Sequence, residues 1–193
     1  MLYFLHGQSF KDDQWDRLGA DEALDTLVNA DEITPFIIVM PKETNYMNSQ
    51  WDSKYGISLA EELVPFIDER YQTIQEREAR AIGGLSRGAA WAVQIGFENS
   101  HLFSRIGAHS LPLFQADGGK VSGWLTQEPV EALPEVFIDI GRSDQEWRTA
   151  EIFANQLDDH HIPHEWHLFT GDHTETYWSA HLKQYLMWYA HNW

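Results

Sequence analysis

Ser86 lies between two glycines in the stretch Gly84-Leu85-Ser86-Arg87-Gly88, a G-x-S-x-G sequence. The stretch follows an apolar run that ends at Ile82 and precedes a helical pattern that starts near Arg87. A serine at such a strand-to-helix turn has a strained backbone, and it needs small residues two positions away on either side because strand and helix approach closely there. The context predicts a nucleophilic serine for acyl transfer, whereas the pentapeptide alone would also fit a glycine-rich loop.

A serine hydroxyl becomes an effective nucleophile when a base removes its proton, and a carboxylate must orient that base. On sheets of this type the chain order is Ser, then Asp or Glu, then His. His173 fits the base because it follows the last predicted strand, and Asp144 fits the acid because it follows the strand before that one. Two rivals remain for the acid: Asp139, which lies within a strand and would point toward one face, and Asp172, which directly precedes the histidine.

Acyl transfer also needs two backbone N–H groups near the serine, because negative charge develops on the attacked carbonyl oxygen. The N–H of Arg87, directly after Ser86, would supply one. The N–H of Gln8 would supply the other, since His6-Gly7-Gln8 follows the first predicted strand and Gly7 lets the backbone turn. His6 is expected to support this loop rather than to act as a base.

Short apolar runs alternate along the chain with longer amphipathic stretches. The predicted strands are 2–5, 36–40, 79–82, 104–108, 136–140 and 165–169, and the predicted helices include 87–97, 147–160 and 174–190. A further helix is predicted to open at a capping box, Ser58-Leu-Ala-Glu61, and to be kinked by Pro65. Strands separated by helices require crossover connections, so we predict a mostly parallel sheet with helices on both faces, within a single α/β domain over residues 1–193.

Two loop segments, 42–56 and 111–134, follow the carboxyl ends of predicted strands. Ligands bind at that edge of open parallel sheets, so we expect both loops to shape the pocket. Tyr46, Trp51 and Trp124 are the expected substrate-binding side chains within them. The alternative is that these aromatic side chains only pack the loops onto the domain.

The composition restricts the class of partner. Of the 193 residues 43% are hydrophobic, which is enough for a sizeable core, and the formal net charge of −17 repels nucleic acids and anionic membrane surfaces. The absence of cysteine excludes disulfides and thiolate chemistry, and no apolar run approaches the roughly 20 residues of a membrane span. No signal peptide is recognised, which leaves the location open between the cytoplasm of a bacterium and secretion from it.

An ordered series of motifs resembles the esterase D-like family of α/β-hydrolases, which includes feruloyl and other carbohydrate esterases, enterochelin esterases and S-formylglutathione hydrolases. The motifs are YFLHG at 3–7, Trp15, PFIIVMP at 35–41, ELVPFIDERY at 62–71, GLSRG at 84–88, and GDH at 171–173 with Trp178. The resemblance implies a minimal six-stranded α/β-hydrolase sheet that lacks the usual first two strands, with Ser86, Asp144 and His173 as its triad. It implies no cofactor and no metal. Glu175 stands where a tryptophan is common in the family.

These observations predict a serine carboxylic ester hydrolase that works through an acyl-enzyme on small or carbohydrate-linked esters of acetyl or feruloyl type. A thioesterase or a peptidase would use the same triad. The non-enzymatic alternative is a carbohydrate-binding module on the same fold, because nine tryptophans could stack on sugars.

Two further hypotheses concern metals and assembly. The cluster His160, His161, His164 and His167 does not have the spacing of a helical zinc site, and its last two members would point to opposite faces of a strand. If the sheet order follows the family, the strand at 36–40 is an edge, which a second copy of the chain would cover in a homodimer.

Overall fold

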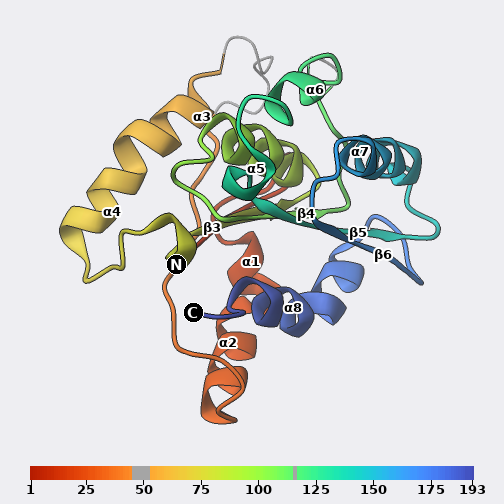
Figure 1. Ribbon diagram of the computed structural model, residues 1–193. Helices are drawn as coiled ribbons and strands as arrows, with labels where there is room; N and C mark the ends of the chain where they lie inside the picture. Colours follow the sequence, from red (N-terminus) through yellow and green to blue (C-terminus); the bar gives the residue numbers. More distant parts are fainter. Residues whose placement is uncertain (45–52, 115–116) are drawn as a thin grey trace.

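In the part of the chain that the structure describes, residues 1–44, 53–114 and 117–193, six parallel strands form one sheet (Figure 1). This computed structural model has the strands β1 (Leu2–Leu5), β2 (Ile38–Val39), β3 (Ala81–Leu85), β4 (Arg105–His109), β5 (Glu135–Gly141) and β6 (His164–Phe169). Their order across the sheet is β2-β1-β3-β4-β5-β6, and every neighbouring pair is parallel. The predicted α/β class and six-stranded sheet are therefore confirmed.

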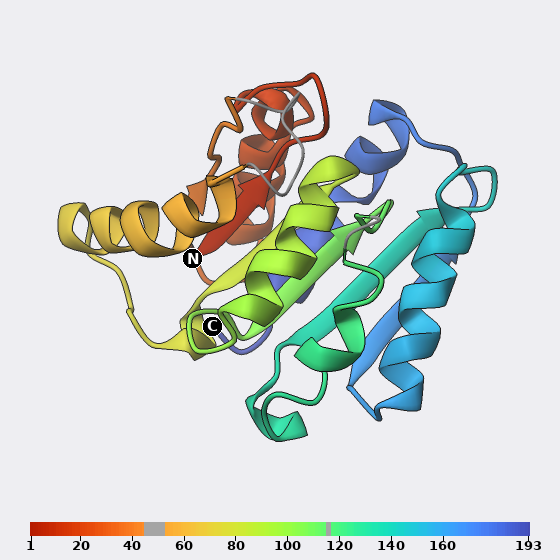
Figure 2. The same ribbon diagram turned by 90° about the horizontal axis from the view of Figure 1, so that it is seen from above.

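Helices cover both faces of the sheet. Figure 1 shows α5 (Arg87–Glu98) and α7 (Trp147–Asp159) above it, and α2 (Ala20–Asn29) and α8 (Glu175–Tyr189) below it. Seen from above, α5 and α7 run along the strands (Figure 2). Shorter elements are α1 (Gln14–Arg17), α3 (Tyr55–Ser58), α4 (Val64–Arg70), α6 (Val121–Trp124) and 3₁₀ turns at Arg77–Ala79 and Val130–Ala132. None of the described helices is long and apolar enough to cross a membrane.

The central strands β1, β3 and β4 are buried at every position because each face of the sheet carries its own core. Side chains alternate along β1, so Tyr3 and Leu5 join the cluster that includes α5 and α7, whereas Leu2 and Phe4 join the cluster that includes α2 and α8. Trp15 of α1 stacks on Phe4 at a ring-centroid distance of 3.6 Å and donates its indole N–H to the Leu5 carbonyl at 2.9 Å. The short helix α1 is thereby fixed to the end of β1.

Strand β3 extends three residues beyond the predicted end at Ile82, so Ser86 follows the strand directly. Gly83 and Gly84 follow the predicted end of the strand, but both lie within it. A Cβ on Gly83 would overlap the Tyr189 hydroxyl of α8, and a Cβ on Gly84 would lie 2.5 Å from the Gly88 carbonyl carbon. Close packing on both faces, rather than a turn, requires glycine at these two positions.

The prediction of a helix start at Ser58 is wrong. Helix α3 begins at Tyr55 and continues through a π-helical segment, Leu59–Leu63, directly into α4. A proline inside an α-helix clashes with the carbonyl four residues earlier, and the wider π turn gives the ring of Pro65 room. The helix therefore continues through the proline, with a change of helical type just before it.

The edge strand β2 pairs only with β1 among the described strands, and it is two residues long rather than five. Its position at the edge agrees with the sheet order expected from the family resemblance. A second copy of the chain covering this edge stays a prediction.

Gly88 provides a test of the close approach between the sheet and α5. A Cβ there would meet the Leu5 carbonyl and would lie 2.6 Å from the His6 carbonyl oxygen, so we expect Gly88→Ala to lower the free energy of unfolding by about 3 kcal/mol. Urea denaturation measures this change. The control is Gly123→Ala, since a Cβ at that position would meet no atom within 4 Å apart from its chain neighbours and the backbone of its own helix. Equal stability of the two variants would contradict the close-packing explanation.

Candidate active site

Ser86 occupies the turn between β3 and α5 with a backbone that ordinary L-residues rarely adopt. Its φ is 53° and its ψ is −123°, and its carbonyl accepts the Ala89 N–H at 2.8 Å. A left-handed φ at a serine is strained, and the surrounding packing must hold it. The approach of Gly84 to Gly88 described above supplies that packing, because the strand and the helix leave room for no side chain on either glycine.

The structure brings Ser86, His173 and Asp144 together at the carboxyl edge of the sheet. Nε2 of His173 lies 2.8 Å from Oγ of Ser86, and Nδ1 lies 3.0 and 2.9 Å from the two carboxylate oxygens of Asp144. Because a carboxylate can only accept, Nδ1 carries the proton, and Nε2 accepts the hydroxyl proton of Ser86. The three residues predicted from chain order thus form one continuous chain of hydrogen bonds.

The carboxylate of Asp144 is fully buried and is stabilised in its ionised form. Burial raises the pKa of Asp144, but hydrogen bonds from His173, from the Glu146 N–H and from the Ser110 hydroxyl outweigh burial, so the pKa lies below its ordinary value. The Glu146 N–H donates to Oδ1 at 2.8 Å. The acid is therefore charged, and it can support a positive charge on His173.

Ser110 and Trp178 form a hydrogen-bonded pair beside Asp144, and the sequence did not predict this pair. The indole N–H of Trp178 donates to Oγ of Ser110 at 3.0 Å, and the Trp178 ring packs edge-on against His173 with centroids 5.0 Å apart. Ser110 is fully buried and has a φ of 53°. Only this turn after β4 places its hydroxyl beside Asp144, which is why the sequence pattern could not identify it.

Neither rival carboxylate contacts His173. Asp139 points to one face of the sheet, as predicted for a residue within a strand, and there it accepts hydrogen bonds from Nδ1 of His109 at 2.6 Å and from the Tyr177 and Tyr185 hydroxyls at 2.7 Å each. Asp172 accepts the Thr174 hydroxyl at 2.8 Å within its own loop. The buried Asp139 network joins β4 and β5 to α8, the helix that follows His173.

The predicted oxyanion donors, the backbone N–H groups of Arg87 and Gln8, have no acceptor among the described residues. The neighbouring Gly7 N–H, in contrast, donates to Oε1 of Gln14 at 2.8 Å. Both ring nitrogens of His6 are used in the same loop, since Nδ1 donates to the Gly7 carbonyl at 2.8 Å and Nε2 accepts the Glu43 N–H at 2.9 Å. His6 therefore supports the loop, as expected.

The side chain of Arg87 points away from its own N–H into an ion pair. Its Nε and Nη2 lie 2.8 and 2.6 Å from the two carboxylate oxygens of Glu43, and both side chains are largely buried. The guanidinium also lies over the rings of Trp91 and Phe114, at 5.8 and 5.2 Å from their centroids. This contact ties the segment after β2 to the first turn of α5.

The structure does not bring Trp124 to Ser86. Its side chain is 6% exposed and stacks on Phe97 with centroids 6.3 Å apart, near the carboxyl end of α5. Phe97 lies eleven positions beyond Ser86, which is roughly 16 Å along a helix that rises about 1.5 Å per residue, and Trp124 packs at that far end of α5. The other two predicted substrate-binding residues, Tyr46 and Trp51, lie outside the described residues.

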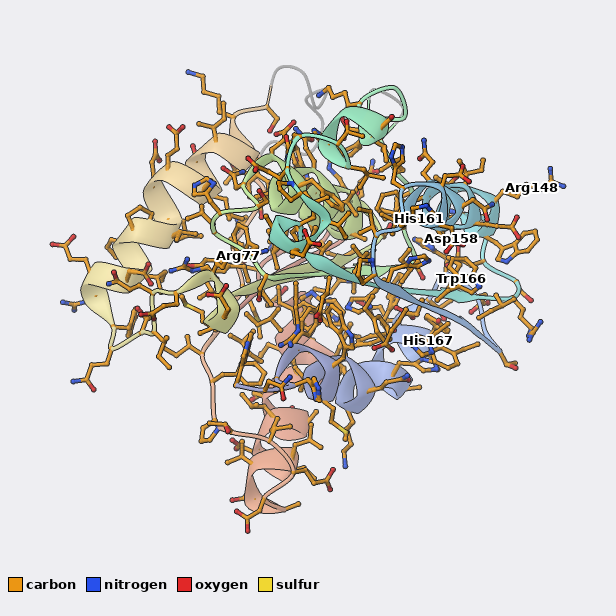
Figure 3. All side chains as sticks on the ribbon, in the orientation of Figure 1. Arg77, Arg148, Asp158, His161, Trp166 and His167 are labelled. Atoms are coloured by element: carbon orange, nitrogen blue, oxygen red, sulfur yellow. The ribbon has the colours of Figure 1, made fainter. Side chains whose placement is uncertain are left out.

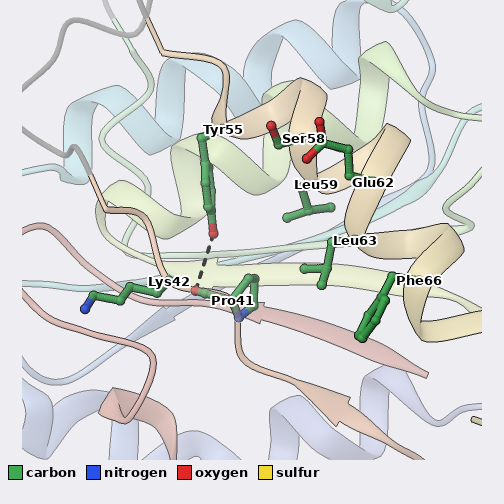
Figure 4. Close-up of a pocket in the computed structure, with 8 residues that line it drawn as sticks. All are labelled: Pro41, Lys42, Tyr55, Ser58, Leu59, Glu62, Leu63 and Phe66. Atoms are coloured by element: carbon green, nitrogen blue, oxygen red, sulfur yellow. Dashed lines mark hydrogen bonds between the residues drawn. The ribbon is translucent and has the colours of Figure 1, made fainter. Parts of the chain in front are cut away.

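A cavity of about 510 Å³ lies between the segment after β2 and the helical segment that runs from α3 to α4 (Figure 4). Its lining residues are Pro41, Lys42, Tyr55, Ser58, Leu59, Glu62, Leu63 and Phe66. The hydroxyl of Tyr55 donates to the Pro41 carbonyl at 3.4 Å, and burial raises the pKa of Tyr55 well above its ordinary value. The triad residues take no part in this cavity.

The histidines considered for a metal are divided between the two sides of β6. Figure 3 shows His161 on the side of α7 and His167 on the side of α8. His167 stacks on Phe137 at 4.6 Å and contacts Glu165 at 2.8 Å, whereas His164 pairs through Nδ1 with the Ile162 carbonyl at 3.0 Å.

The sheet order, the serine turn and the helices on both faces define an α/β hydrolase. The family model described as "Putative esterase" matches residues 1–189, and the chain belongs to this family. The protein is therefore an esterase, as the series of motifs predicted.

Solved structures with the same fold include three informative relatives. A ferulic acid esterase superposes with a TM-score of 0.86 at 24% identity, covering 98% of this chain and 84% of that one. A serine-to-alanine mutant of the feruloyl esterase module from Clostridium thermocellum, complexed with sinapinate, gives 0.82 at 15% identity, with 98% and 77% covered. An S-formylglutathione hydrolase from Staphylococcus aureus gives 0.76 at 16% identity, with 98% and 80% covered.

The lowered pKa of Asp144 predicts a pH dependence of stability. A carboxyl group whose pKa is lower in the folded chain stabilises the fold above its unfolded pKa of about 3.9, and this stabilisation is lost as pH falls through the folded value. We expect the wild type to be more stable than Asp144→Asn at pH 7, and the difference to shrink below about pH 4. Urea unfolding of both proteins at matched pH values measures it, and a difference that stays constant into acid would contradict the assignment.

Proposed function

We propose that the protein is a serine carboxylic ester hydrolase in which Ser86 forms an acyl-enzyme, His173 is the base and Asp144 orients it. The observation that carries this proposal is the continuous hydrogen-bond chain from Oγ of Ser86 through His173 to the ionised Asp144. The strained φ of the serine supports it, because such strain persists where the fold must hold one side chain in place.

In the first half-reaction Oγ of Ser86 attacks the ester carbonyl carbon while Nε2 of His173 accepts the hydroxyl proton. Asp144 stabilises the imidazolium that results. The carbonyl oxygen becomes an oxyanion, and the N–H groups of Arg87 and Gln8 are the proposed donors to it. The bond from carbon to the alkoxy oxygen then breaks, and His173 returns its proton to the departing alcohol, which leaves an acyl group on Ser86.

Water completes the cycle by the same route. His173 takes a proton from water, the hydroxide attacks the acyl carbon, and the same two N–H groups hold the second oxyanion. Collapse breaks the bond to Oγ, and His173 gives its proton back to Ser86. The products are a carboxylic acid and the free enzyme, so the chemistry needs no cofactor or metal.

Small or carbohydrate-linked esters of acetyl or feruloyl type are the substrates we propose. Two of the superposed structures are a ferulic acid esterase and a feruloyl esterase module with sinapinate bound. The net charge of −17 also favours neutral esters over anionic ones, because it repels anions during approach. A thioesterase is the second candidate function, because an S-formylglutathione hydrolase is among the superposed structures.

Replacement of Ser86 by alanine tests the nucleophile. We expect Ser86→Ala to lower kcat for p-nitrophenyl acetate and methyl ferulate by about 10⁴-fold or more, the scale seen when a triad serine is removed elsewhere. A labelled fluorophosphonate should react with the wild type and not with the variant.

The control is Ser122→Ala, whose hydroxyl only approaches His160 at the surface. Retained activity in Ser86→Ala would exclude the acyl-enzyme. A folded wild type that binds feruloylated oligosaccharide without hydrolysing it would favour the carbohydrate-binding alternative, and faster turnover of S-formylglutathione than of methyl ferulate would favour a thioesterase.

The choice of acid is tested by comparing two aspartates of the same region. Asp144→Asn should lower kcat by about 10³- to 10⁴-fold, because an amide can hold the wrong tautomer of His173 and cannot stabilise its charge. Asp172→Asn should stay within about threefold of the wild type, since Asp172 contacts Thr174 rather than the imidazole. The reverse ranking in steady-state assays would assign the role to Asp172.

A further inference from the structure

Gln14 is a fully buried polar residue that the proposed reaction does not use. It lies at the start of α1 with 0% of its surface exposed, and both ends of its side-chain amide are bound. Oε1 accepts the Gly7 N–H at 2.8 Å, and Nε2 donates to Oε1 of Glu175 at 3.0 Å. One side chain therefore connects the loop after β1 to the first turn of α8.

Both partners of Gln14 adjoin groups that the proposed reaction needs. Gly7 directly precedes Gln8, one of the two proposed oxyanion donors, and Glu175 lies two residues after His173. Glu175 also accepts a hydrogen bond from Nη2 of Arg17 at 3.1 Å. The loop has little freedom on its other side, because a Cβ on Gly7 would lie 2.8 Å from the Leu85 side chain just before Ser86.

The chemistry of this position is selective. The buried Gly7 N–H requires an acceptor, and the Glu175 carboxylate can only accept, so the side chain between them must both accept and donate to bind both. A glutamine supplies both from one planar group, whereas an apolar side chain would leave a buried N–H without a partner.

We propose that Gln14 is a positioning residue for the oxyanion loop: it fixes the His6–Gly7 peptide, directly before the Gly7–Gln8 peptide, so that the Gln8 N–H faces the carbonyl oxygen of the bound ester, and through Glu175 it sets this loop against the His173 turn. This inference rests on the proposed function. It assigns to Gln14 an effect on the rate of acyl transfer, with little effect on ester binding in the ground state.

The first test is Gln14→Met, which keeps the length of the side chain and removes both hydrogen bonds. Loss of one oxyanion donor costs about 10²- to 10³-fold in kcat elsewhere, and a displaced donor should cost less. We expect kcat per active site to fall about 10- to 100-fold, with KM within about threefold. Active sites are counted by fluorophosphonate labelling, so a misfolded fraction does not enter the rate.

The second test is the reciprocal exchange Gln14→Glu with Glu175→Gln. The carboxylate at position 14 can still accept the Gly7 N–H, and the amide at position 175 can donate to that carboxylate. We therefore expect the kcat of the double variant to lie within about threefold of the wild-type value, above that of Gln14→Met. The matched control is Arg17→Gln, which removes an exposed partner of Glu175 and leaves the bridge intact. It should change kcat by less than threefold.

The outcomes separate this inference from the proposed function. If Ser86→Ala abolishes hydrolysis but Gln14→Met keeps the wild-type kcat per labelled site, the positioning role is wrong and the serine mechanism stands. A kcat of the reciprocal double variant as low as that of Gln14→Met would also overturn the role. It would mean that the hydrogen bonds from position 14 to Gly7 and to position 175 do not determine the rate. If hydrolysis does not depend on Ser86, the proposed function fails first.

Discussion

The close approach of β3 to α5 at Gly84 and Gly88 is the constraint on which the rest of the site depends. It forces the strained backbone of Ser86 and aims the hydroxyl out of the sheet at its carboxyl edge. The same approach places Gly88 against the carbonyls of Leu5 and His6, so the loop after β1 lies beside the first turn of the helix. Nucleophile and proposed oxyanion donors are thus positioned by one packing contact.

The parallel sheet supplies the other groups by its order alone. Loops that follow β1, β5 and β6 all emerge at the edge where Ser86 lies, and they carry Gln8, Asp144 and His173. Polar networks then hold these loops from both sides of the sheet. Ser110 and Trp178 support Asp144 near the edge, and the buried Asp139 network joins α8 to β4 and β5 below the sheet.

The sequence predicted the parts of this arrangement that depend on order and periodicity. The strands, the sheet class and the places of Ser86, Asp144 and His173 follow from where apolar runs end. The sequence did not reveal contacts made only by tertiary packing, such as the Ser110 hydroxyl behind Asp144 or the amide of Gln14. The burial of the Trp124 ring against Phe97 is another such contact, because a loop position does not reveal it. The π turn before Pro65 replaced the predicted capping box because local steric demands outweighed a matching tetrapeptide.

The ion pair between Arg87 and Glu43 couples the segments that surround Ser86. A guanidinium held by two short charge-assisted hydrogen bonds and covered by two aromatic rings moves only together with its carboxylate. Glu43 also donates its backbone N–H to His6. Hydrogen bonds therefore join the segment after β2 to both the loop after β1 and the start of α5. A substrate that displaces one of these three segments on entry would therefore strain the other two.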